Sequence, residues 1–289
     1  QAQVHCLRFV QGARACGAGP PGATDMESVW SRRIGWLALL LGLAMALALF
    51  APARWLAQAV TGMTDGRLQL PNARGSVWRG QADLLLTGGA GSQSSAALPG
   101  GIRWRLRPAW DGGAPALRLA LEAPCCTTEP VLLSLRGGLS GAGLHLAASR
   151  SHWPAELLSG LGTPWNTLRL EGRLQLQTDG FTASWTRGRL GLQGRLGVDA
   201  FDLSSRLSTL RPLGSYRLEL QAASDGHTGT LLLSTHTGAL HLQGQGQWVG
   251  SRLRFEGVAE PAAGREMALA NLLNIIGRRD GARSLLRLG

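Results

Sequence analysis

Lysine is absent from the 289-residue chain, tyrosine occurs once and phenylalanine occurs only five times. All 29 basic residues are therefore arginines, and with 18 acidic residues the formal net charge is +11. Arginine stays charged and makes forked hydrogen bonds to phosphate or carboxylate groups. A lysine-free chain rich in glycine and alanine indicates a GC-rich genome rather than a mode of binding, but the excess positive charge still implies an acidic partner.

The distribution of the arginines argues against nucleic acid as that partner. They are spread singly through strand-like stretches such as "RWRLR" at 103–107, and no compact basic helix or aromatic-studded RNA-binding motif is visible. Acidic membrane headgroups or acidic proteins fit a membrane-tethered domain better. We therefore expect membrane and protein partners and no nucleic acid.

Signatures of catalysis are also missing. The sequence has no H-E-x-x-H, no G-x-S-x-G nucleophile elbow, no P-loop and no dinucleotide fingerprint. The acidic residues are scattered singly, and His145, His152 and His227 have no carboxylate or cysteine at ligand spacing. His236 and His241 are five residues apart and would face opposite sides of a strand. We predict that the protein is not an enzyme and has no catalytic, cofactor-binding or metal site.

The four cysteines form two separate pairs in the sequence. Cys6 and Cys16 lie in the N-terminal tail, whereas Cys125 and Cys126 are adjacent in "APCCTTEP". Disulfide geometry favours Cα atoms farther apart than one peptide unit allows, and no further metal ligands lie nearby. Two interpretations of the adjacent pair stay open: unpaired small hydrophobic residues, or a redox-labile vicinal pair.

A long apolar run, "IGWLALLLGLAMALALFA" at 34–51, predicts where in the cell the protein lies. Spanning a bilayer core takes about 20 apolar residues, which this run reaches with its flanks. Positive residues precede it and stay cytoplasmic, and tryptophans stand near its two ends. We predict a signal anchor over 26–56 of a bacterial inner-membrane protein, single-pass, with a cytoplasmic N-terminus and a periplasmic bulk. A cleaved signal peptide with an A-x-A site at 51–53 is the alternative. The anchor residues are Arg32, Arg33, Trp36, Leu40, Leu47 and Trp55.

Residues 1–25 differ in character from the remainder of the chain. They show no periodicity and contain Gly-Pro-Pro-Gly at 19–22. Met26 then opens a short arginine-bearing segment that leads into the apolar run, which is a sensible start for an inner-membrane protein. We expect residues 1–25 to be a non-native N-terminal extension.

The rest of the chain has the pattern of a β meander. Apolar and polar residues alternate, as in "TLRLEGRLQLQ" at 167–177, and tight turns between such runs imply antiparallel neighbours. We predict a mainly β periplasmic domain over 57–289, a long, curved antiparallel meander sheet with one apolar face, with halves at 67–150 and 163–289. The turn signals are Thr178-Asp179-Gly180, Asp225-Gly226, Thr237-Gly238 and Gly250-Ser251.

Two short helices interrupt the predicted strands. The first, His152–Gly162, has Pro154 near its start and a glycine after its end. The second, Gly264–Gly277, is amphipathic, and a final strand at Arg283–Leu288 closes the chain. The apolar residues of the second helix are Met267, Leu269, Leu272, Leu273 and Ile276.

One segment, "GSVWRG" at 75–80, is similar to a second one, "GQWVGSRLRF" at 246–255. Each pairs glycine with a large residue before a strand, and glycine inside strands marks bends or the close approach of another backbone. We regard both phrases as structural, with flanking side chains available for contacts. The candidate interaction residues are Trp78, Arg79, Trp248 and Arg252, together with Arg278 and Arg279 in the charged turn after the second helix.

An ordered set of stretches from Met26 onward resembles the type II secretion system protein N family. The set comprises the N-terminal anchor, "GSVWRGQA", "LLSGLGTPWNTLRLEGRLQL", "LRPLGSYRLEL", "GQGQWVGSRLRFEG" and the C-terminal "REMALANLLNIIGRRDGARSLLRLG". The resemblance implies a bitopic inner-membrane protein with a periplasmic β domain and no enzymatic activity. It also implies an accessory role in the machine that exports folded proteins from the periplasm.

Two functions are compatible with this resemblance. In the first, the protein contacts other secretion components, namely the inner-membrane platform, the connector protein C or the secretin, through strand addition or charge complementarity. In the second, the apolar sheet face is an open trough that binds lipid or another hydrophobe, as in the distantly similar AsmA-like group. That second interpretation rests on analogy of fold.

Overall fold

The structure is a computed structural model that describes residues 24–89, 91–92, 94–111, 113–138, 141–186, 189–222, 229–249 and 252–288. Within these ranges, the side chains at 24–34, 44, 48, 249, 252 and 288 are not described. The chain forms two compact units, residues 1–49 and 50–289. Nearly all of the expected extension at 1–25 lies outside the described residues.

The first unit contains helix α1 (Thr24–Leu49), which has 26 residues. The side chains of Trp36, Leu40 and Leu47 are exposed on it, and those of Arg32 and Arg33 fall among the undescribed ones. Within the described residues, no helix is both long and apolar enough to cross a membrane. The signal anchor therefore stays a prediction.

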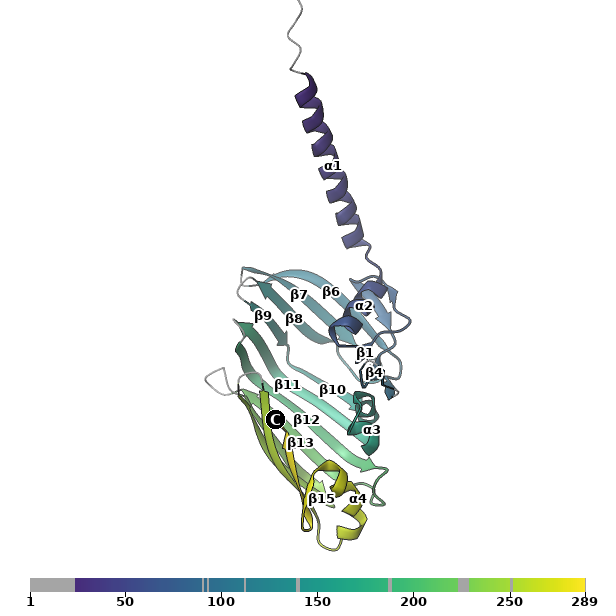
Figure 1. Cartoon of the computed structure of the whole chain (residues 1–289), viewed down its shortest axis with the longest axis vertical. Coiled ribbons are helices and arrows are strands. Elements are labelled where there is room, and N and C mark those ends of the chain that lie inside the picture. Colours follow the sequence, from purple (N-terminus) through teal and green to yellow (C-terminus); the bar gives the residue numbers. More distant parts are fainter. Residues whose placement is uncertain are drawn as a thin grey trace, which may run out of the picture. The chain divides into compact units, whose positions relative to one another are not determined.

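The second unit is dominated by one antiparallel sheet of 15 strands (Figure 1). The sheet confirms the prediction of a mainly β fold, while the curvature of an AsmA-like sheet and the division into halves stay predictions. The strands are β2 (Arg74–Gly75), β3 (Arg79–Ala82), β6 (Ile102–Asp111), β7 (Ala114–Glu122), β8 (Val131–Gly138), β9 (Gly141–Leu146), β10 (Ser149–Pro154), β11 (Leu170–Thr186), β12 (Arg189–Ser205), β13 (Gly214–Ala222), β14 (Gly229–Gly238), β15 (Leu240–Val249), β16 (Arg252–Pro261), β17 (Arg278–Asp280) and β18 (Arg283–Leu288).

The order of strands across the sheet is nearly that of the chain. It runs β2, β3, β6 to β9, β11 to β16, and then β18 and β17. Because consecutive strands are neighbours, the alternating pattern places one apolar face along the whole sheet. The predicted final strand, Arg283–Leu288, is β18 and pairs with both β16 and β17.

Strand β11 is 17 residues long and joins the early strands to the late ones. One of its edges pairs with β12, and the other pairs first with β10 and then with β9. The predicted turn at Thr178-Asp179-Gly180 is wrong, because the strand runs through it with a bulge between Thr178 and Phe181. The Thr178 hydroxyl stabilises this bulge by donating to the Arg195 carbonyl oxygen at 2.7 Å and accepting from the Gly180 N–H at 3.1 Å.

The remaining elements are short. The predicted helix at Gly264–Gly277 is α4, but the one predicted at His152–Gly162 is a 3-10 helix that begins only at Ala155, because the residues before it pair with β11 in strand β10. The elements are α2 (Ala53–Met63), which contains Trp55, η1 (Ala155–Leu161), α3 (Trp165–Leu168), α4 (Glu266–Ile276) and a small sheet of β1 (Leu68–Gln69), β4 (Leu85–Thr87) and β5 (Ser95–Ala97).

Two separate hydrophobic cores lie on the sheet. In the first, α2, the small sheet and η1 pack around Trp104 of β6. In the second, Leu269, Leu272 and Leu273 of α4 pack against Leu240 of β15 and its neighbours. The first core covers strands that come early in the strand order, and the second covers strands that come late. Each end of the long sheet is therefore stabilised by its own core.

Candidate interaction surface

The phrase "GSVWRG" is the hairpin that joins β2 to β3. Gly75 and Gly80 are opposite each other in the ladder, and the Ser76 N–H donates to the Arg79 carbonyl oxygen at 2.9 Å. Gly75 has a φ of +93°, and a Cβ there would lie 2.5 Å from that same carbonyl oxygen. The turn therefore requires glycine at position 75, and Arg79 is the first residue of β3 after it.

Trp104 holds this hairpin on the sheet. Its side chain is 2% exposed, and its indole N–H donates to the Val77 carbonyl oxygen at 3.0 Å. Gly80 is its cross-strand neighbour, and a Cβ at position 80 would lie 2.4 Å from the ring. Trp78, half-buried, accepts a hydrogen bond from the Leu106 N–H at its carbonyl oxygen, at 2.7 Å. This packing fixes β3 beside β6.

On the opposite, polar face, β2, β3, β6 and β7 carry exposed arginines that we call the arginine surface. Cross-strand register places Arg79 opposite Arg105 and Arg107 opposite Arg118. Like charges directly opposite each other on neighbouring strands destabilise the pair. The members are Arg74, Arg79, Arg103, Arg105, Arg107 and Arg118.

Within the described residues, a single ion pair offsets this charge. Glu122 of β7 lies 3.5 Å from the Arg105 guanidinium. Asp83, in a neighbouring pocket beside Arg74 and Arg103, accepts a hydrogen bond from Asn72 at 2.8 Å. The arginine surface therefore keeps most of its positive charge uncompensated.

Many arginines of the later strands stand beside carboxylates, and Asp199 of β12, nearly buried, contacts both Arg217 and His236 at 3.3 Å. Among the early strands, Arg136 of β8 pairs with Asp111 of β6 at 2.6 Å. The shortage of carboxylate partners is therefore a property of the arginine surface rather than of the early strands as a whole. The ion pairs include Arg173–Asp202, Arg195–Glu219, Arg206–Glu171, Arg211–Glu171, Arg283–Asp280 and Arg287–Glu256.

A pocket of about 500 Å³ indents the arginine surface. It is lined by Arg74, Arg79, Arg103, Arg105 and Glu122, with Gly75 and Gly80 between them. The glycines leave the backbone of the hairpin accessible at the centre of this charge. The geometry suits an anionic group that several guanidinium forks can hold at once.

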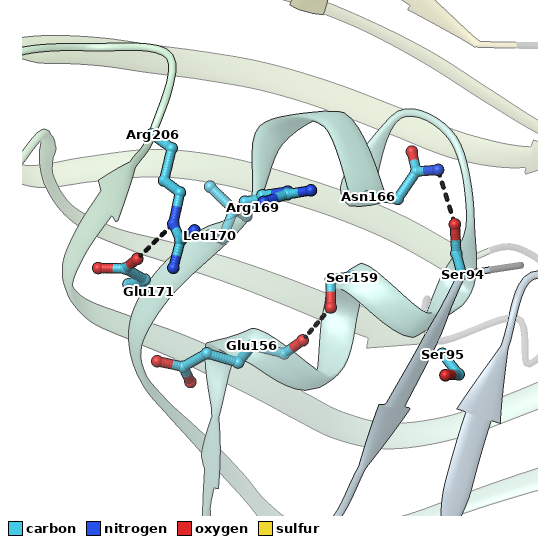
Figure 2. A pocket seen from close by; sticks show the side chains of 9 residues that line it. All are labelled: Ser94, Ser95, Glu156, Ser159, Asn166, Arg169, Leu170, Glu171 and Arg206. Atoms are coloured by element: carbon cyan, nitrogen blue, oxygen red, sulfur yellow. Dashed lines mark hydrogen bonds and ion pairs between the residues drawn. The ribbon is translucent and has the colours of Figure 1, made fainter.

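A second polar pocket, of about 420 Å³, lies where η1 and α3 meet β11 (Figure 2). There Arg206 donates to Glu171 at 3.1 Å, and Asn166 donates to the Ser94 hydroxyl at 2.9 Å. The Ser159 hydroxyl donates to the Glu156 carbonyl oxygen at 2.6 Å. These groups satisfy one another, so the pocket has the features of a structural junction between the small sheet and β11.

The other sequence-predicted residues are scattered. Trp248 is half-buried at the end of β15, and Arg252 begins β16, with its side chain outside the described set. Arg278 and Arg279 form part of the edge strand β17 rather than a turn, and both are exposed. The structure thus brings Arg79 together with new arginines but leaves the remaining candidates apart.

The adjacent cysteines are joined in a disulfide, so the vicinal pair is the interpretation that the structure adopts. Cys126 is buried in the first core. In the part of the chain that the structure describes, no group of three or more His, Cys, Asp or Glu side chains is arranged to hold a metal ion.

The model of one protein family, described as type II secretion system, protein N, matches residues 66–285. The chain belongs to this family. The match covers the arginine surface, the second core and all of the sheet except the end of β18, whereas α2 of the first core precedes it. The type II secretion protein N family consists of components of a secretion system and is not a known enzyme family, and membership implies other secretion components as partners. Comparison with curated protein sequences and with solved structures found no match.

Most residues of the arginine surface of this type II secretion protein N were not predicted from the sequence. The sequence pattern predicts Arg79 as an interaction residue, but not Arg74, Arg103, Arg105, Arg107 or Arg118. The alternating "RWRLR" is the available signal, because every second residue of a strand faces one side. The register that places these arginines beside one another on β3, β6 and β7 cannot be derived from any single stretch of sequence.

Proposed function

We propose that the protein is an accessory inner-membrane component of the type II secretion system that assists export of folded proteins from the periplasm through protein–protein contacts. Its partners are the inner-membrane platform, the connector protein C or the secretin. The observation that carries the proposal is the arginine surface, whose uncompensated charge within a family of secretion components fits recognition of an acidic partner.

The inner-membrane location is part of the same proposal. The apolar run at 34–51 is helical to Leu49, and its described side chains in the helix are exposed. Exposed leucines all round a helix suit lipid better than water. Arginines before the run favour an orientation with its N-terminal side in the cytoplasm and the β domain in the periplasm.

The sheet edges favour charge complementarity over strand addition. Among the described residues, no strand pairs with the edge of β6 beyond β3, and the Leu106 N–H on that side already donates to the Trp78 carbonyl oxygen. Pro108, two residues on, has no N–H to offer there, and proline marks edges that resist pairing. At the other end, β17 is only three residues long, exposed and charged. Both edges are therefore poor templates for an added strand.

The test is secretion by a strain that lacks the gene and carries a variant copy. Arg103→Glu with Arg105→Glu reverses charge on the arginine surface, and we expect secretion to fall toward the level of the deletion strain. Arg173→Glu with Arg206→Glu reverses the same charge at exposed, paired arginines of the later strands and serves as the control. Normal export from the deletion strain, with normal assembly of the secretion complex, would contradict the proposal.

A second candidate, a periplasmic trough for lipid or another hydrophobe, is favoured by one observation. A groove of about 460 Å³ on β7, β8, β9 and β11 is lined almost entirely by apolar groups, including Leu117, Leu135, Leu144 and Trp185. Trp185 is 47% exposed, and Trp110, near the same strand ends, is 72% exposed. Lipid extraction and mass spectrometry of purified protein test it: stoichiometric lipid that is lost in Leu135→Gln supports the trough, and lipid-free protein counts against it.

A further inference from the structure

We propose that the arginine surface binds an extended acidic segment of a protein partner, with carboxylates at every second residue. This inference rests on the proposed function and names the chemistry of the partner. It starts from Arg103, Arg105 and Arg107, which alternate along β6 and therefore point to the same, polar face.

The spacing of these arginines selects the form of the ligand. Alternate residues of an antiparallel strand are about 6.8 Å apart, since each residue rises about 3.4 Å. A peptide in the same extended conformation repeats its own alternate side chains at this distance. Three carboxylates at alternate positions can therefore each meet one guanidinium, whereas contiguous acidic residues alternate between the two sides of the peptide.

The arginines on neighbouring strands widen this row. Arg79 of β3 lies opposite Arg105, and Arg118 of β7 lies opposite Arg107. Each of these cross-strand pairs is a like-charge contact in the free protein. Glu122 of β7, opposite Arg103 and 3.5 Å from Arg105, offsets part of the charge at the first pair, whereas no ion pair offsets Arg107 and Arg118 among the described residues. A carboxylate placed over the Arg107–Arg118 pair is attracted by two guanidinium groups and relieves their repulsion, so binding stabilises the sheet as well as the complex.

The surroundings favour a peptide over nucleic acid. Trp104, between Arg103 and Arg105, is buried, so its ring is not exposed for the stacking of bases that single-stranded nucleic acid binding requires. Gly75 and Gly80 line the same pocket and let a ligand backbone approach closely. Guanidinium forks match the planar carboxylate.

The experiment measures binding of synthetic peptides to the purified full-length chain by fluorescence anisotropy. The probe has aspartate at every second position and serine or threonine between, and the control peptide has the same composition with contiguous aspartates. We expect the alternating peptide to bind more tightly, and binding to weaken as salt is raised. Equal affinity for the two peptides would overturn the proposed spacing.

A matched pair of variants locates the site. Replacing Arg103, Arg105 and Arg107 by glutamine should weaken binding by at least about tenfold, since each loses a charge-assisted contact. Replacing Arg173, Arg195 and Arg206 by glutamine removes the same charge from exposed, paired positions and should change it little. Equal losses in both triples would assign binding to net charge and overturn the inference.

Two further probes compete with the peptide. Anionic phospholipid vesicles or single-stranded DNA that displace it and bind more tightly through the same three arginines would overturn the assignment to an acidic protein segment.

The secretion assay tests the proposed function separately from the binding of the acidic peptide. If the β6 triple variant loses the peptide but secretes normally, the acidic ligand stands and the role of this surface in secretion fails.

Discussion

At the scale of single residues, glycine and tryptophan decide how the first hairpin attaches to the sheet. Gly80 lies under the ring of Trp104, and any larger side chain must displace a ring that is buried in the first core. Strand positions without such a neighbour tolerate a methyl group. Gly137 of β8 is one, because a Cβ there would meet nothing within 4 Å.

We therefore expect Gly80→Ala to destabilise the protein by about 1–3 kcal/mol, the usual range for overpacking. Denaturant unfolding followed by tryptophan fluorescence measures it, and Gly137→Ala is the matched control. Equal stability of the two variants would contradict the close packing of Trp104 on Gly80.

Tyr216 is the single tyrosine of the chain and is buried in β13. Its hydroxyl donates to the Leu240 carbonyl oxygen at 3.0 Å, and burial raises the pKa of Tyr216 well above its usual value. A phenol whose folded pKa exceeds the unfolded one contributes stability below the unfolded value of about 10 and loses it as pH rises above that value.

The expected result is that the tyrosinate absorbance of the native protein appears only together with unfolding, at a pH above the ordinary tyrosine value. Because there is one tyrosine, an ultraviolet titration reports this residue alone. Tyr216→Phe should remove the tyrosine contribution to alkaline destabilisation. Free ionisation of Tyr216 in still-folded protein would show that its side chain is not buried.

At the scale of elements, α4 shows how a helix closes one end of the sheet. Leu269, Leu272 and Leu273 face the second core, as the apolar pattern predicts, but Met267 is 95% exposed. At 100° per residue, Met267 lies on the side of the helix opposite the mean direction of the buried leucines. Met267 is therefore an apolar residue of α4 that does not contribute to the buried face of this amphipathic helix.

Leu273→Ala should lower the free energy of unfolding by about 2–5 kcal/mol, because the side chain is fully buried and leaves a cavity. Met267→Ala should change it by less than about 0.5 kcal/mol, since it sits on the surface. Chemical denaturation of both variants checks this, and a similar loss in both would mean that α4 packs differently.

The same elements show how far the sequence predicts structure. Period-two runs identify strands, since a sheet with one wet face requires that alternation. The run at 167–177 is a strand from Leu170 onward, but its first two residues belong to helix α3. Local sequence signals fail where pairing with another strand determines the conformation. Thr178-Asp179-Gly180 has the composition of a turn but forms a bulge paired with β12. His152 precedes residues with a helical pattern but pairs with β11 as part of a strand. The arginine surface likewise depends on register between β3, β6 and β7, which no single stretch encodes.

At the scale of the whole molecule, two cores stabilise one sheet from its two ends. Leu157 of η1 belongs to the first core and Leu273 of α4 to the second, and the two clusters share no member. Independent sites add their effects on stability, whereas residues in contact do not.

Leu157→Ala and Leu273→Ala should therefore be additive within about 0.5 kcal/mol when combined. A double-mutant cycle of unfolding free energies measures the coupling. A larger interaction energy would mean that the sheet transmits packing changes from one core to the other.

The near-sequential order of the strands bears on how the chain folds. Pairing between neighbours in the chain gives contacts of short sequence separation, which favour fast folding for a β protein. In the proposed topology the β domain reaches the periplasm in chain order, so most strands find a partner that has already arrived. The exceptions include β17, whose partner β18 follows it in the chain and pairs through its other edge with β16. Pairing of β18 with β16 is then the step that joins the β17–β18 hairpin to the sheet, and a chain truncated before β18 would leave β16 with an open edge.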